Sequence, residues 1–192
     1  MRERIDWAAG AWTTPPASAV AGDALRVTAA EGSDAWRRTA YGFVHDTEHA
    51  LLAPLPVGAA MEVVFTADFD REFDQAGIFV RADAERWMKA GVEYADGVLG
   101  VGAVVTDRMS DWSVGAVPEW AERTLRVRVS RLPDALVVRA GIDGEPLRLV
   151  RVAPFAGDLD AAAGPFVCAP TRSGLEVVFR TWERTDADTA LH

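Results

Sequence analysis

Apolar and polar residues alternate with a period of two along several segments of this chain. Residues 61–69 place apolar side chains at every second position: Met61, Val63, Phe65, Ala67 and Phe69. Segments 124–130 and 175–180 alternate in the same way. Because successive side chains of a β-strand point to opposite faces of a sheet, this period predicts strands with one buried face. No segment has a sustained apolar period of 3.6 residues, and the best helix candidate, residues 83–86, suffices only for a turn.

Short turn signals separate the strand-like runs. They are Asp96-Gly97, Asp143-Gly144, Gly164-Pro165 and Ser173-Gly174. Each Asp-Gly pair lies between two apolar runs and predicts a β-hairpin. Many strands at short spacing, joined by Gly and Pro turns, predict an all-β sandwich or barrel. The 192 residues suit one such domain, which we expect over residues 1–183, with a flexible C-terminal tail at 184–192.

The charge balance narrows the range of partners. The chain has 20 Lys and Arg against 29 Asp and Glu, a net charge of −9. Nucleic acid or an anionic membrane would require a basic stripe, which is not visible, so both are disfavoured. The N-terminus has no apolar run typical of a secretory signal, and no segment approaches the roughly 20 apolar residues of a membrane span. We therefore expect a cytoplasmic protein.

Nucleophilic and cofactor-dependent chemistry has little support in the sequence. Cys168 is the single cysteine, and its apolar neighbours indicate a buried and inert thiol. The chain has no nucleophile-elbow motif and no glycine loop of the kind that binds phosphate. We therefore expect no cofactor.

One predicted strand carries an aromatic ring, a cation and a carboxylate on its polar face. These are Trp87, Lys89 and Glu93. The alternate positions are apolar and suit a core face: Met88, Ala90, Val92 and Tyr94. This combination is typical of a polar pocket, in which Trp87 stacks on a flat ligand and the two charged groups form hydrogen bonds. The alternative is an exposed cross-strand ion pair with Trp87 as partly buried packing.

Several motifs in order resemble a known protein family. They are Asp74-Gln75-Ala76-Gly77, Val80-Arg81, Trp87 to Glu93, Val104-Val105-Thr106 and Ser110 to Ser113, with Asp34 to Arg38 and Tyr41-Gly42-Phe43 upstream and Asp143-Gly144, Cys168-Ala169-Pro170 and Gly174 to Phe179 downstream. The family is a domain of unknown function that includes the fungal "regulation of enolase" protein, within the concanavalin A-like lectin/glucanase superfamily. The resemblance spans residues 12–182 and implies a two-sheet antiparallel jelly roll with a concave groove.

The candidate ligand residues are expected to line this groove. Gln75 and Arg81 lie six residues apart on another strand and therefore on one face. Trp112, in an Asp-Trp-Ser loop, would close one end of the groove, and His45 would add a neutral hydrogen-bonding group. The full candidate set is Trp36, His45, Gln75, Arg81, Trp87, Lys89, Glu93 and Trp112.

A glycoside hydrolase would need two carboxylates roughly 5 to 10 Å apart. The laminarinase-like relatives in the superfamily carry a Glu-x-Asp-x-x-Glu strand motif. Its best match here is Glu72-x-Asp74-x-x-Gly77, in which glycine replaces the acid/base residue and removes the proton donor. Asp74 and Glu93 remain as a different candidate catalytic pair.

The segment His45-Asp-Thr-Glu-His49 fits the H-x-x-E-H pattern of one group of metallopeptidases. That chemistry requires both histidines on one face of a helix and a third ligand. The flanking residues predict strand and loop, and the remaining histidine is His192, near the chain end. We therefore expect no metal site.

Three functions remain open at this point. The leading hypothesis is a non-catalytic, lectin-like protein that binds a saccharide or a similarly hydroxylated small metabolite in its groove. The second is a carbohydrate-active enzyme that uses Asp74 or Glu93. The third is a regulatory module whose groove docks a partner protein.

Overall fold

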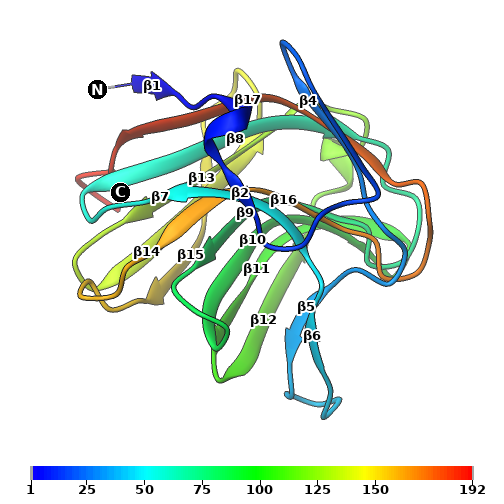
Figure 1. The fold of residues 1–192 in the computed structure, drawn as a ribbon, viewed down its shortest axis with the longest axis horizontal. Helices are drawn as coiled ribbons and strands as arrows, with labels where there is room; N and C mark the ends of the chain where they lie inside the picture. The colour runs from blue at the N-terminus through cyan, green and yellow to red at the C-terminus, as the bar shows by residue number, and fades with distance from the viewer. Residues whose placement is uncertain (1, 192) are drawn as a thin grey trace.

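The computed structural model describes residues 2–191. Two large antiparallel sheets pack face to face, and the described residues contain no α-helix (Figure 1). The predicted all-β, two-sheet antiparallel sandwich is confirmed. No helix in the described range is long and apolar enough to cross a membrane.

One sheet contains eight strands and includes the three segments whose alternation predicted strands. In spatial order it comprises β15 (Arg148–Pro154), β14 (Ala135–Ile142), β13 (Leu125–Arg131), β8 (Ala59–Ala67), β17 (Glu176–Asp186), β4 (Leu25–Thr28) and β3 (Ser18–Ala21), and β1 (Arg2–Arg4) pairs with β17. Short 3-10 turns, η1 (Trp7–Ala9) and η2 (Pro118–Trp120), lie in two of the connections.

The other sheet carries the candidate site. In spatial order it comprises β12 (Met109–Ala116), β11 (Val98–Asp107), β10 (Arg86–Ala95), β9 (Gln75–Arg81), β16 (Ala162–Cys168), β7 (His49–Pro54) and β2 (Ala11–Trp12). Asp96-Gly97 joins β10 to β11 as predicted, with φ of 53° and 77° at its two residues. Positive φ at both positions is the requirement of a tight hairpin turn, and Asp and Gly tolerate it.

The main core lies between the two sheets. It receives Met88, Ala90 and Val92 from β10, as the alternation predicted. From the opposite sheet come large side chains such as Phe65 and Trp182. The interior is therefore filled by the inward faces of both sheets, as in other sandwiches.

The outer face of the seven-stranded sheet is also partly buried. A two-stranded hairpin, β5 (Ala35–Arg37) with β6 (Val44–Asp46), stands beside this sheet (Figure 1). The hairpin is tied to the sheet next to its connecting loop by the backbone N–H of Arg37, which donates to Ser110 Oγ on β12 at 2.9 Å. A second apolar cluster forms here: Ala35, Trp36, Ala50, Phe79, Trp87, Val104, Phe166 and Cys168.

Strand β17 (Glu176–Asp186) continues past the boundary expected for the C-terminal tail. The boundary expected at residue 184 falls inside β17, which ends at Asp186. Beyond it, the Asp188 carboxylate accepts hydrogen bonds from Arg128 Nε at 3.0 Å and Arg139 Nε at 3.1 Å. Residue 192 lies outside the described range.

Candidate functional site

A cavity of about 410 Å³ lies on the outer face of the seven-stranded sheet, beside the β5–β6 hairpin. Its aromatic lining comprises Trp36, Tyr41, Phe43, Phe73 and Trp112. Its polar lining includes Asp34, His45, Gln75, Lys89 and Glu93. Apolar walls with a few convergent polar groups, at this volume, are typical of a small-molecule site.

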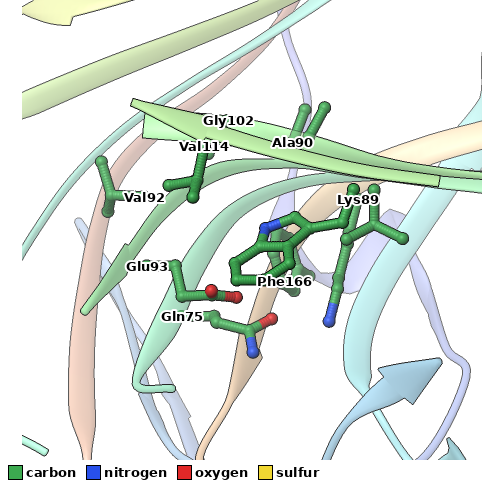
Figure 2. Close-up of a pocket in the computed structure, with 12 residues that line it drawn as sticks. Gln75, Lys89, Ala90, Val92, Glu93, Gly102, Val114 and Phe166 are labelled. Atoms are coloured by element: carbon green, nitrogen blue, oxygen red, sulfur yellow. The ribbon is translucent and has the colours of Figure 1, made fainter. Parts of the chain in front are cut away.

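The strand register places the polar groups on the floor. Glu93 on β10 lies directly opposite Gln75 on β9, and Lys89 lies opposite Val104 on β11. Figure 2 shows the Glu93 carboxylate next to the Gln75 amide, with the Lys89 amine extending to the same side of the sheet. The shared face of Lys89 and Glu93, predicted from the period of two, is therefore present.

A row of glycines separates Lys89 from Glu93 on this floor. Gly91 lies opposite Gly77 on one side and Gly102 on the other. A Cβ added at Gly91 would lie 2.2 Å from the backbone oxygen of Ala76. Larger residues do not fit here without moving the neighbouring strand, so the floor between the two charged side chains is bare backbone.

Lys89 is buried and paired. Its Nζ donates to Asp34 Oδ1 at 2.7 Å, and its side chain is only 5% exposed. Burial by itself lowers the pKa of Lys89, but the carboxylate of Asp34, with smaller contributions from other acidic groups, raises it above its ordinary value. Lys89 is therefore an ammonium whose charge Asp34 balances.

Glu93 is the unsatisfied group of the site. Its Oε1 is buried and has no hydrogen-bond partner among the described residues. Burial raises the pKa of Glu93 to about 7; Lys89 opposes this rise, and the negative charges of Asp34 and Glu72 add to it. A carboxyl group with this pKa exchanges its proton near neutral pH, which is characteristic of functional sites.

The hairpin supplies an aromatic wall. Tyr41 stacks on Phe43 with ring centroids 5.3 Å apart, and its ring also meets the Trp36 ring edge-on at 5.7 Å. Phe43 in turn contacts the His45 ring at 4.6 Å. Trp112, 41% exposed, lines the cavity from β12 on the sheet side. It lies in a strand, so the expected Asp-Trp-Ser loop is wrong.

Trp87 and Arg81 do not line this cavity. Trp87 is 2% exposed and stacks on Phe79 at 5.3 Å beneath the hairpin, so its ring faces are not available to a ligand. The expected stacking position is therefore corrected to a packing position. Arg81 instead pairs with the buried carboxylate of Glu48 at 3.5 Å.

Asp74 is also absent from the cavity lining. It is fully buried, and Arg172 Nε donates to both of its oxygens at 3.0 Å. The backbone N–H groups of Asp70 and Arg71 donate to its Oδ2. This carboxylate holds two loops together, and the structure does not bring it to the cavity with Glu93 as a catalytic pair.

The two histidines of the H-x-x-E-H segment lie in different environments. His45, on β6, lines the cavity. His49, on β7, is buried; its Nε2 accepts from the backbone N–H of Ala30 at 3.1 Å, and its Nδ1 lies 3.1 Å from the Thr14 carbonyl oxygen. The segment runs from β6 through a two-residue connection into β7 and contains no helix, and residues 2–191 contain no group of three or more potential metal ligands.

Several lining residues were not among the sequence candidates. Tyr41 and Phe43 precede His45 at alternate positions, and this aromatic period of two was a signal that could have been used. Phe73 and Asp34 gave no such signal. Asp34 meets Lys89 across 55 residues of chain, and only the folded structure brings them together.

Comparison with known proteins gives the family. Residues 12–187 match the family described as "Protein of unknown function (DUF1349)". The chain belongs to this family. It is 37% identical over 186 residues to "Regulation of enolase protein 1" of Saccharomyces cerevisiae, covering 95% of this chain and 93% of the yeast protein. The family resemblance seen in the sequence motifs is confirmed.

Solved structures support the same fold. A functionally unknown protein from Saccharomyces cerevisiae superposes with a TM-score of 0.90 at 32% identity, over 96% of this chain and 100% of that one. A mutant of the GH43 protein BlXynB from Bacillus licheniformis gives a TM-score of 0.72 at 12% identity, over 97% of this chain and 38% of the enzyme chain. At that identity the second likeness shows only that this DUF1349 member shares its sandwich fold with part of a glycoside hydrolase.

Proposed function

We propose that this protein binds a saccharide or a similarly hydroxylated small ring compound in the 410 Å³ cavity. The observation that carries the proposal is the combination of aromatic rings on the walls with hydrogen-bonding groups on the floor. Sugar rings have apolar faces and polar edges, and this cavity offers a partner for each. The resemblance to sandwich regions of carbohydrate-processing proteins is consistent with this function.

The two tryptophans of the cavity have different roles in this proposal. Trp36 is nearly buried, and its Nε1 donates to the Thr39 carbonyl oxygen at 3.0 Å, which shapes the hairpin loop. The indole of Trp112 has no hydrogen-bond partner within residues 2–191, and Trp112 is 41% exposed, so it can pack against a ligand without rearranging the fold. We assign the main stacking surface to Trp112, with Tyr41 facing from the hairpin.

The polar floor would fix the orientation of the ligand. Glu93 Oε1 lacks a partner, and Gln75 lies beside it. A ligand hydroxyl donating to the Glu93 carboxylate would offset the cost of an acceptor without a hydrogen bond, about 1–3 kcal/mol. The bare glycine floor allows a ring to approach the backbone between Lys89 and Glu93.

Isothermal titration calorimetry with a panel of mono- and disaccharides tests the proposal. Trp112→Ala is expected to weaken binding about 5- to 30-fold, because stacking on an aromatic ring contributes about 1–2 kcal/mol. Met109→Ala is the matched control, since Met109 is an exposed residue of the same strand that does not line the cavity. No binding at millimolar sugar, or equal losses in both variants, would contradict the proposal.

A second candidate function is acid–base catalysis by Glu93 on the bound carbohydrate. The observation that favours it is the pKa of about 7 for a carboxyl group at the cavity floor, because a general acid or base works best near the ambient pH. Asp34 is the other carboxylate of the cavity, and it is held by Lys89. Turnover of aryl glycosides that disappears in Glu93→Gln would support this candidate; turnover that persists would exclude Glu93 as catalyst.

A further inference from the structure

Some charged groups of the cavity have a partner of opposite charge, and one does not. Lys89 and Asp34 balance each other at 2.7 Å. Glu93, on the same floor, has a buried oxygen with no hydrogen-bond partner within residues 2–191. The cavity thus presents one unpaired acidic group to whatever occupies it.

The cavity has no free cation that would suit an anionic ligand. Lys89 and His45 are its only basic lining residues in the described chain. Two guanidinium groups, of Arg37 on β5 and Arg81 on β9, are engaged elsewhere: Arg37 pairs with Glu85 at 2.9 Å, and Arg81 pairs with Glu48. A carboxylate or phosphate on the ligand would therefore meet Glu93 without a compensating partner, which is unfavourable in a partly buried site.

The aromatic lining favours positive charge. Faces of Trp, Tyr and Phe rings attract cations through the ring quadrupole, by about 0.5–2 kcal/mol. Tyr41, Phe43 and Trp112 line the same cavity as Glu93. Aromatic rings around an unpaired carboxylate are the arrangement that recognises an ammonium group.

We propose that the ligand of this cavity carries a protonated amine, as in an amino sugar or another hydroxylated primary amine, and that Glu93 binds this ammonium group. This inference rests on the proposed function and narrows its ligand class. The ring or polyol part packs on Trp112 and Tyr41, and the ammonium donates to the Glu93 carboxylate, which lines the cavity. Lys89 remains paired with Asp34 and is not displaced.

The pH dependence of binding follows from the groups around Glu93. Lys89 on β10 favours the ionised form of Glu93, whereas Asp34 before β5 and Glu72 before β9 oppose it. His45 on β6 lines the same cavity. The strand partners of Glu93, Gln75 on β9 and Gly100 on β11, are uncharged. With a pKa of about 7, Glu93 changes from about one-tenth ionised at pH 6 to about nine-tenths at pH 8. An ammonium ligand should therefore bind about tenfold more tightly at pH 8 than at pH 6.

The test uses three methyl glucosides that differ only at C6, which carries an amine, a hydroxyl or a carboxylate. Calorimetry at pH 6, 7 and 8 compares their affinities for the full-length protein. The C6 amine remains protonated over most of this range, so Glu93 is the main titrating partner. The inference predicts that the amine binds at least tenfold more tightly than the hydroxyl compound at pH 8, that its affinity falls about tenfold by pH 6, and that the carboxylate binds most weakly.

Glu93→Gln is the matched variant, because it keeps the shape and removes the charge. It should abolish the advantage of the amine and its pH dependence while the hydroxyl compound still binds; its far-UV circular dichroism confirms the fold. Equal affinity of amine and hydroxyl compounds in the wild type would overturn this inference and leave the proposed function standing. Absence of binding by all three glucosides would overturn both.

Discussion

Replacing Trp87 by alanine separates the packing role that the structure gives this residue from a ligand-binding role. Trp87 is 2% exposed, and its ring stacks on Phe79 at 5.3 Å. Removing a buried tryptophan side chain costs about 3–5 kcal/mol through lost burial and the cavity left behind. For a chain of this size each kcal/mol lowers the melting temperature by about 2–4 °C, so a fall of about 6–20 °C is expected.

The assays are thermal unfolding, which gives the melting temperature, and urea denaturation followed by tryptophan fluorescence and by circular dichroism, with the midpoint compared at an unchanged slope. Trp112→Ala is the control, because Trp112 is 41% exposed on the same face of the same sheet. It should change the free energy of unfolding by about 1 kcal/mol or less. A loss below about 1 kcal/mol for Trp87→Ala, or equal losses in the two variants, would refute the assignment of Trp87 to packing.

Three further changes test other parts of the structure. Gly91→Ala should destabilise the fold by about 1–3 kcal/mol or more, because the added Cβ would lie 2.2 Å from the Ala76 oxygen. Gly115→Ala is the control and should be neutral, because a Cβ at Gly115 would have no atom within 4 Å. Equal urea midpoints of the two variants would contradict the close packing of the glycine row. Arg172→Ala should lower the free energy of unfolding by about 2–4 kcal/mol, because it leaves the buried Asp74 carboxylate with only backbone donors. Arg71 is an exposed arginine nearby, and Arg71→Ala serves as the control. Similar melting temperatures of the two variants would argue against a structural role for the Asp74 ion pair. Glu93 has a folded-state pKa of about 7 against an ordinary value of 4.5, so the folded state binds more protons between these pH values. The contribution of Glu93 to the free energy of unfolding is therefore fully present below pH 4.5 and lost as pH rises through 7, and Glu93→Gln should remove about 1–3 kcal/mol of this pH dependence. Parallel profiles of stability against pH for the two proteins from pH 4 to 8 would speak against the raised pKa.

The fold could be predicted because it depends on local periodicity. The alternation of residues 61–69 became β8, and Asp96-Gly97 became the turn between β10 and β11. Both signals are carried by residues that are neighbours in the sequence. A shift of the strand pairing by one residue would bury the polar side chains, so the alternation also determines which face is buried. The family motifs then supplied the two-sheet arrangement, which periodicity alone left open between sandwich and barrel.

The candidate site was predicted in part. The common face of Lys89 and Glu93 followed from the period of two, and the cavity confirms that both lie on one floor. The position of Trp87 on that face was also right, but its exposure was not, because the β5–β6 hairpin covers it. Which of several aromatics on one face remains accessible depends on a segment some fifty residues away, and no local pattern encodes that.

Ion pairs between residues far apart in the sequence could not be predicted. Asp74 occupies the Asp position of the segment that best matches the Glu-x-Asp-x-x-Glu motif, which made it a catalytic candidate. Arg172, 98 residues further along the chain, binds it instead. Asp34 was quoted only as part of a motif, although it determines the charge state of Lys89. Such pairings depend on loop positions that strand alternation does not constrain.

A crystal soaked with the methyl glucoside series tests the central claim most directly. We expect density for a sugar ring against Trp112 in the cavity beside the β5–β6 hairpin, with a polar ligand atom within hydrogen-bonding distance of the Glu93 carboxylate. A glucoside bound on another surface, with this cavity left empty at a concentration that saturates binding in solution, would contradict it.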